Sequence, residues 1–125
     1  MSETASYENI MAWRKAHGLA LEIYLVTKRF PRSEAFGLTS QLRRAAISIP
    51  TNIVEGYARQ NRKVYAAFLD LAYGSLVEVK YLLRFASKIG FISAATFSQV
   101  EILADEVGEV LWVYMKEVKS DNRKQ

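Results

Sequence analysis

An all-α fold is predicted by this sequence: one domain, built as an antiparallel up-down-up-down four-helix bundle with a proline-kinked second helix. Apolar residues recur at steps of three and four along almost all of the 125 residues, which is the period of an amphipathic helix. Only two prolines and six glycines interrupt this pattern, and no strand-like alternation of apolar and polar residues competes with it. Helices of about 20–27 residues joined by short loops pack antiparallel to their neighbours, which gives the bundle.

Each helical stretch has a recognisable beginning or end. Pro31 ends the first, because the residue before a proline resists the α conformation. The apolar stripe of the second continues in phase across Pro50, so we expect a kink within one helix. Gly90 is a natural stop for the third. Candidate N-caps are Ser33 or Thr39 for the second helix and Ser93 for the fourth. The expected helices span residues 7–30, 38–58, 63–89 and 94–118, followed by a frayed polar tail, 119–125.

The composition argues against most kinds of catalytic site. There is no cysteine, which excludes a disulfide framework, a cysteine nucleophile and a thiolate metal site. The single histidine, His17, falls on the apolar face of the first helix, where we expect a core or rim residue with one hydrogen-bond partner. Di-iron sites in bundles need Glu-x-x-His pairs on two helices, and no phosphate loop or nucleophile elbow appears. We expect no metal, no cofactor and no catalysis; a site assembled between subunits is the remaining alternative.

The sequence also predicts a cytoplasmic location. Residues 1–8 lack the basic and apolar regions of a secretory signal. No apolar run approaches the ~20 residues that a membrane span needs. The lack of cysteine suits a reducing compartment.

Positive charge is concentrated in the middle of the chain. The net charge is +4, but residues 59–90 carry six basic and two acidic groups, whereas residues 91–125 carry four basic and six acidic. Tyr57 and Tyr65 flank the basic segment, which allows base stacking beside phosphate contacts; the simpler interpretation is packing at helix ends. If nucleic acid is a ligand, we expect the phosphate contacts from residues clustered near the second loop: Arg43, Arg59, Arg62 and Lys63.

A narrow line of polar residues runs along the second helix, beside its apolar stripe. The steps of three and four place its members on one face. Two interpretations stay open: a solvated flank, or a polar network under a partner helix or subunit. The line comprises Gln41, Arg44, Ser48, Asn52, Glu55 and Arg59.

The third and fourth helices carry complementary charges at steps of four. The basic stripe is Lys80, Arg84 and Lys88, and the acidic stripe is Glu101, Asp105 and Glu109. Folding the chain back between the helices brings Arg84 to the level of Glu101 and Lys80 to that of Asp105. Exposed pairs of this kind contribute about 0–1 kcal/mol each. We therefore leave the basic stripe out of the nucleic-acid patch.

A long motif runs through the first loop and the second helix: Phe30-Pro31, Glu34, Phe36-Gly37-Leu38, Gln41-Leu42-Arg43-Arg44-Ala45, Ser48-Ile49-Pro50, Asn52-Ile53, Glu55-Gly56 and Arg59. Flanking residues fit the same pattern: Trp13, Lys15-Ala16, Tyr24, Phe68-Leu69, Ala72, Gly74-Ser75 and Glu78. Together they resemble the four-helix bundle proteins also called 23S ribosomal RNA intervening-sequence proteins, over roughly residues 7–115. Val54 and Lys80 depart from the family pattern, and Lys80 puts in doubt any shared acidic role there.

The resemblance implies assembly more strongly than it implies a ligand. Members are small bacterial bundles, ring-shaped pentamers are known among them, and no enzymatic activity is established for the family. The bundle is also similar to the accessory protein of diversity-generating retroelements, a pentamer that engages reverse transcriptase and nucleic acid. We therefore expect a homo-oligomer, by resemblance a pentamer. Large aromatics exceed what one small core absorbs, so some should lie at subunit contacts: Trp13, Tyr73, Tyr81 and Trp112.

Three functions remain open from the sequence. The first is a non-catalytic homo-oligomer that binds RNA, DNA or a nucleic-acid enzyme. The second is a purely protein-binding module without nucleic-acid affinity. The third is an enzyme with a site between subunits. Salt-dependent binding of RNA separates the first from the second.

Overall fold

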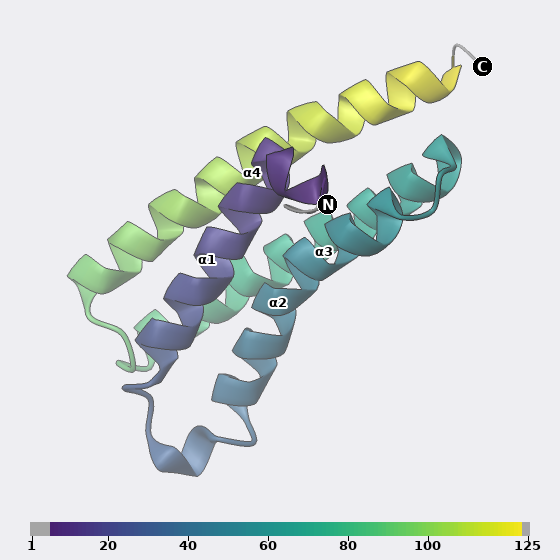
Figure 1. Cartoon of the computed structure of the whole chain (residues 1–125). Coiled ribbons are helices and arrows are strands. Elements are labelled where there is room, and N and C mark those ends of the chain that lie inside the picture. The colour runs from purple at the N-terminus through teal and green to yellow at the C-terminus, as the bar shows by residue number, and fades with distance from the viewer. Residues whose placement is uncertain (1–5, 124–125) are drawn as a thin grey trace.

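The computed structural model describes residues 6–123, which fold into four long helices packed side by side (Figure 1). The elements in chain order are η1 (Ser6–Asn9), α1 (Met11–Thr27), η2 (Arg32–Glu34), α2 (Leu38–Tyr57), α3 (Arg62–Lys88) and α4 (Ala94–Arg123). Each long helix packs against two others, in the cyclic order α1, α2, α3, α4. Consecutive long helices run in opposite directions, so the predicted up-down-up-down bundle is confirmed.

The core consists of one apolar stripe from each long helix. Large residues recur at steps of seven along α3, where Leu69, Leu76 and Leu83 have almost no exposed surface. On α1 many of the buried positions are small, among them Ala12, Ala16 and Ala20, together with Leu19 and Ile23. Between residues 6 and 123, no helix combines the length and the apolar character that a membrane span requires.

The position of His17 on α1 differs from the predicted one. It is exposed instead of lying at the core, and its ring stacks on Trp13 with centroids 4.7 Å apart and planes 11° apart. Ala16 and Ala20 take the neighbouring buried positions. The prediction was wrong because Ala16 and Ala20 take the core positions on either side of His17, and the imidazole stacks on Trp13 outside the core.

The first helix is shorter than the predicted range 7–30. Ile10 adopts an extended conformation, with φ −82° and ψ 119°, and separates η1 from α1. After Thr27 the next three amides bond to carbonyls three residues back. This tightening is of the 3-10 type. It ends the α-helix before Pro31, although Phe30 is still buried.

The second helix is continuous through Pro50, as the uninterrupted stripe predicted. It begins differently from the prediction, however. Gly37 holds the N-cap position, and neither of the two predicted hydroxyl residues caps the helix. Instead, the Leu38 amide donates to Oε1 of Glu34 at 3.1 Å. A carboxylate from η2 thus satisfies an amide of the first turn, which also suits the positive end of the helix dipole.

The turn between α3 and α4 follows the predicted signals. Gly90 adopts φ +86°, the left-handed conformation that glycine reaches without strain. The amides of Gly90 and Phe91 donate to carbonyls in the last turn of α3 at 3.1 and 2.9 Å, the pattern of a Schellman motif. Ser93 Oγ accepts the Thr96 amide at 3.1 Å and caps α4.

The fourth helix extends beyond its predicted end. Residues 119–125 were expected to form a frayed tail, but α4 continues to Arg123. Val118 is only 2% exposed, and Lys119 Nζ lies 3.1 Å from Asp70 Oδ1 on α3. These two contacts hold the extra turn against the bundle. Residues 124 and 125 lie outside the described part of the chain.

Candidate nucleic-acid interface

A tight turn connects α2 to α3 at the end of the bundle opposite to the other two connections (Figure 1). The Arg59 amide donates to a carbonyl of the last turn of α2. Gln60 adopts φ +55°, a left-handed conformation that is uncommon outside glycine. Asn61 is extended and its Oδ1 accepts the Val64 amide at 3.0 Å, which caps α3. Three of the four predicted cations emerge here: Arg59, Arg62 and Lys63.

A cavity of about 480 Å³ opens beside this turn. It is lined by Gly56, Tyr57, Gln60, Asn61, Arg62, Lys63, Tyr65 and Tyr114. None of these residues is a carboxylate, and two are cations, so the lining favours an anionic ligand. Across residues 6–123, no group of three or more acidic or histidine side chains is arranged to hold a metal ion.

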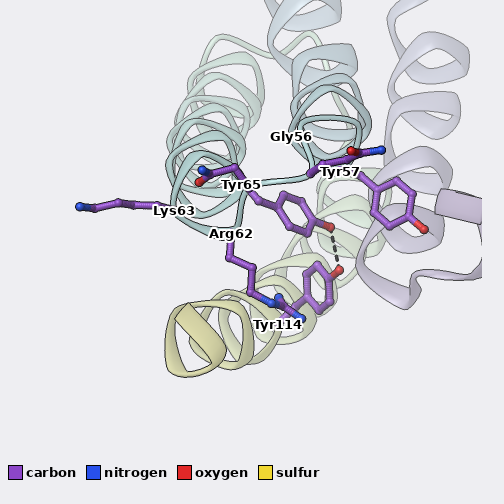
Figure 2. Close-up of a pocket in the computed structure, with 8 residues that line it drawn as sticks. Gly56, Tyr57, Arg62, Lys63, Tyr65 and Tyr114 are labelled. Carbon is purple, nitrogen blue, oxygen red and sulfur yellow. Dashed lines mark hydrogen bonds between the residues drawn. The ribbon is translucent and has the colours of Figure 1, made fainter. Parts of the chain in front are cut away.

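Two tyrosines from different helices meet in the wall of the cavity (Figure 2). The hydroxyls of Tyr65 and Tyr114 form a hydrogen bond of 2.7 Å, and their rings pack edge to face at 5.9 Å. Burial, with the hydrogen bond from Tyr114, raises the pKa of Tyr65 well above its ordinary value. The Tyr65 hydroxyl therefore keeps its proton at neutral pH. Because one proton suffices for the shared bond, the second hydroxyl proton is left to donate elsewhere.

Gly56 lets the two helices approach closely behind the cavity. A Cβ at this position would lie 2.6 Å from Cβ of Phe68 and 2.8 Å from Cδ1 of Tyr65. Both distances are below the 3.0 Å that real Cβ atoms respect. Only glycine allows α3 to sit this near to α2, which sets the position of Tyr65.

The cations of the turn lie at different depths. Arg62 is half-buried and its side chain extends toward Tyr114, whereas Lys63 points away from the cavity (Figure 2). Arg59 is exposed, with its guanidinium 5.0 Å from the centroid of the Phe68 ring. Tyr57 is 41% exposed and packs edge to face against Tyr65 at 6.1 Å.

Arg43 does not belong to this cluster, and the prediction that placed it there was wrong. Its Nε donates to Thr27 Oγ1 at 2.8 Å and its terminal nitrogen donates to the Tyr24 carbonyl at 3.1 Å. It lies 16 positions before Arg59, or about 24 Å along a helix axis. Arg43 instead satisfies carbonyl and hydroxyl oxygens at the end of α1.

The polar line of α2 lies partly where α2 and α3 meet. Ser48 Oγ and Ser75 Oγ are 2.8 Å apart, and Asn52 Nδ2 donates to the Ser48 carbonyl at 2.8 Å. Gln41 Nε2 reaches Glu78 at 3.5 Å. The remaining members are exposed: Arg44, Glu55 and Arg59. The line is thus a network toward the partner helix in its middle and a solvated flank elsewhere.

The predicted charge pairs across the α3–α4 hairpin are confirmed. Arg84 lies 2.7 Å from Glu101, and Lys80 lies 2.8 Å from Asp105. All four side chains are partly exposed. Lys80 and Arg84 are therefore neutralised within the hairpin, while Lys88 is exposed.

The four large aromatics divide between core margin and surface. Trp13 and Tyr73 are half-buried and pack against the core. Tyr81 and Trp112 are 62% and 48% exposed. Two of the four are therefore on the surface of the single chain.

Tyr114 is the residue of the site that the sequence did not indicate. It follows Val107 and Leu111 at steps of four and three, a spacing that is typical of the core face of a helix. The hairpin register of Lys80 and Asp105 places Tyr65 opposite residue 120, more than one turn from Tyr114. The charge pairs thus predicted that the third and fourth helices run antiparallel, but they did not predict the contact between Tyr65 and Tyr114.

The comparisons with known proteins agree on the kind of bundle. A family model described as 23S rRNA-intervening sequence protein matches residues 8–112. A crystal structure of a protein of unknown function from the S23 ribosomal protein family of Bacteroides thetaiotaomicron VPI-5482 is similar in fold, with a TM-score of 0.76 and 21% identity. The match covers 85% of this chain and 99% of that one. Among curated proteins, none matches the chain.

Proposed function

We propose, from the premise that the chain belongs to the 23S rRNA-intervening sequence protein family, that it is a non-catalytic, cytoplasmic bundle that assembles with copies of itself and binds nucleic acid. The observation that carries the proposal is the α2–α3 turn. It combines Arg59, Arg62 and Lys63 with a cavity whose lining, among the residues that the structure describes, contains no carboxylate. Lysine and arginine contacts to phosphates supply most of the affinity of non-specific nucleic-acid binding.

Three of the other basic residues of α2 and α3 are engaged within the bundle, which supports this assignment. Lys80 and Arg84 are neutralised by acidic residues of α4. Arg43 is bound to oxygens at the end of α1. The turn is thus a compact basic patch, called here the turn patch: Arg59, Arg62 and Lys63.

Self-assembly is supported by the number of apolar side chains on the outer faces. Among the described residues, nine large hydrophobics are more than half exposed: Met11, Leu21, Leu25, Phe36, Leu71, Val77, Tyr81, Ile102 and Val113. Where such side chains adjoin one another, they give the apolar surface that is typical of a protein–protein contact. A closed ring, with five copies as the resemblance suggests, repeats the turn patch in every subunit and raises affinity by multivalency.

Binding is tested by fluorescence anisotropy with a labelled single-stranded RNA over a series of salt concentrations. Three phosphate contacts per subunit predict a slope of log K against log salt of about −2 per site. The double variant Arg59→Gln, Lys63→Gln should reduce this slope by roughly two-thirds. The matched control is Lys28→Gln, Arg29→Gln, which removes the same charge at the opposite end of the bundle.

Two results would overturn the nucleic-acid assignment: a binding curve that does not change with salt, or a control variant that weakens binding as much as the turn-patch variant.

Light scattering tests assembly separately, and a single-chain mass at micromolar concentration would refute it. The exposed apolar faces also favour the second candidate, a purely protein-binding module. Stable assembly without any RNA binding would establish that candidate instead.

A further inference from the structure

The cavity beside the turn patch has the size and lining of a site for one nucleotide. We propose that it receives an unpaired base, stacked on Tyr57 and hydrogen-bonded by the Tyr65–Tyr114 hydroxyl pair, so that the protein selects single-stranded over double-stranded nucleic acid. This inference rests on the proposed function, because the turn patch supplies the phosphate contacts. It adds a recognition element that charge alone does not provide.

The dimensions are the first argument. The volume of about 480 Å³ falls within the roughly 300–1,000 Å³ typical of small-ligand pockets. A base held in a duplex is stacked on both sides and its hydrogen-bonding edge is paired, so it cannot enter a pocket without leaving the helix. An unpaired base enters without that penalty.

The aromatic side chains are the second argument. Tyr57 is 41% exposed and lines the cavity, so part of its side chain is accessible to a ligand. Tyr65, held edge to face at 6.1 Å, supports that ring from the protein side. Aromatic rings beside a cationic strip are the usual means by which proteins hold single strands, because every base has a face that stacks.

The hydrogen-bonding groups are the third argument. The pair of hydroxyls holds one proton more than its own bond uses. Asn61 Oδ1 accepts the Val64 amide, which leaves the amide hydrogens of Asn61 to donate. Arg62 extends toward Tyr114 (Figure 2). A lining rich in donors fits the carbonyl oxygens of uracil or guanine and the phosphate oxygens next to them.

The test compares two labelled probes of equal length at one salt concentration: an oligouridylate single strand and a blunt RNA duplex. We expect the wild type to bind the single strand at least tenfold more tightly. Tyr57→Ala should weaken single-strand binding by roughly 5- to 100-fold, the range for loss of one stacked base. Tyr114→Phe keeps the ring and removes a hydroxyl, which should weaken it by about 2- to 10-fold. Duplex binding should change little in either variant.

The matched control is Phe85→Ala, which removes a partly exposed aromatic ring near the end of α3 that is opposite to the turn and should leave both affinities unchanged. Circular dichroism confirms the fold of each variant. Equal affinity for the two probes, or equal losses on both probes in Tyr57→Ala, would overturn the inference and leave the charge-based function standing. If neither probe binds the wild type, both proposals fail.

Discussion

Replacing Gly56 by alanine tests whether α2 and α3 depend on their close approach. The new Cβ would lie 2.6 Å from Cβ of Phe68, whereas ordinary contact begins at 3.4 Å. The helices must therefore separate locally by about 0.8 Å, the difference between these two distances. Phe68 cannot relieve the clash by changing its rotamer, because a Cβ atom moves only with its backbone.

The expected loss of stability follows from this geometry. Overpacking a well-packed interior destabilises by about 1–3 kcal/mol. Alanine favours the helix over glycine by up to about 1 kcal/mol, but this gain is small here because Gly56 is the penultimate residue of α2. For a chain of this size, the midpoint temperature should fall by roughly 3–15 °C. Urea denaturation at a fixed protein concentration measures the free energy of unfolding.

Two other glycines provide the controls. Gly18 and Gly74 lie within exposed parts of α1 and α3, and a Cβ on either meets nothing within 4 Å. Gly18→Ala and Gly74→Ala should therefore stabilise the protein by about 0.5–1 kcal/mol. If Gly56→Ala stabilises the protein by the same amount, close packing at Gly56 is refuted.

Three further predictions concern single contacts. Asn61→Ala removes the cap of α3 and should lower the free energy of unfolding by about 0.5–2 kcal/mol in urea, whereas Asn61→Asp, another strong N-cap residue, should restore most of it. A double-mutant cycle of Arg84→Ala and Glu101→Ala should give a coupling below about 1 kcal/mol that fades with salt; a coupling above about 2 kcal/mol would contradict a partly exposed pair. Because the folded-state pKa of Tyr65 is raised, the unfolded chain loses this proton first, near pH 10. Stability should therefore be complete below that pH and fall above it, and Tyr65→Phe should show a smaller fall; identical pH profiles would exclude the effect.

The α3–α4 hairpin was predictable down to individual ion pairs, because its information is local in sequence. Periodicity gives the two helices, Gly90 and Ser93 give the turn, and an antiparallel geometry then fixes which levels meet. Arg84 and Glu101 follow from that register. Errors in the predicted register of the two helices grow with distance from the turn. For this reason the contact between Tyr65 and Tyr114 was not predicted.

Contacts between distant segments were not predictable in the same way. Arg43 carries a long side chain whose direction depends on where α1 ends, and α1 ends at Thr27 rather than at residue 30. The guanidinium donates to Thr27 Oγ1 and to the Tyr24 carbonyl at that end. Arg43 is therefore not part of the basic patch. The prediction for His17 was wrong for a related reason. The periodicity of apolar residues identifies one face of α1, but it does not give the rotation of the helix about its axis at which small residues pack most closely against the other helices.

The unequal lengths of the helices make the bundle uneven along its axis. α4 has 30 residues and α1 has 17, so at 1.5 Å per residue they measure about 45 and 26 Å. α1 starts where Met11 and Val113 line one groove, and of the four long helices α2, α3 and α4 continue past that level. We expect the backbone amides of this three-helix section to open at a lower free energy than those around Leu76, which should exchange with solvent only through unfolding of the whole chain. Hydrogen exchange should therefore be fastest toward the α2–α3 turn, so that Tyr57 and Arg59 can adjust to a ligand while the fold below them stays closed.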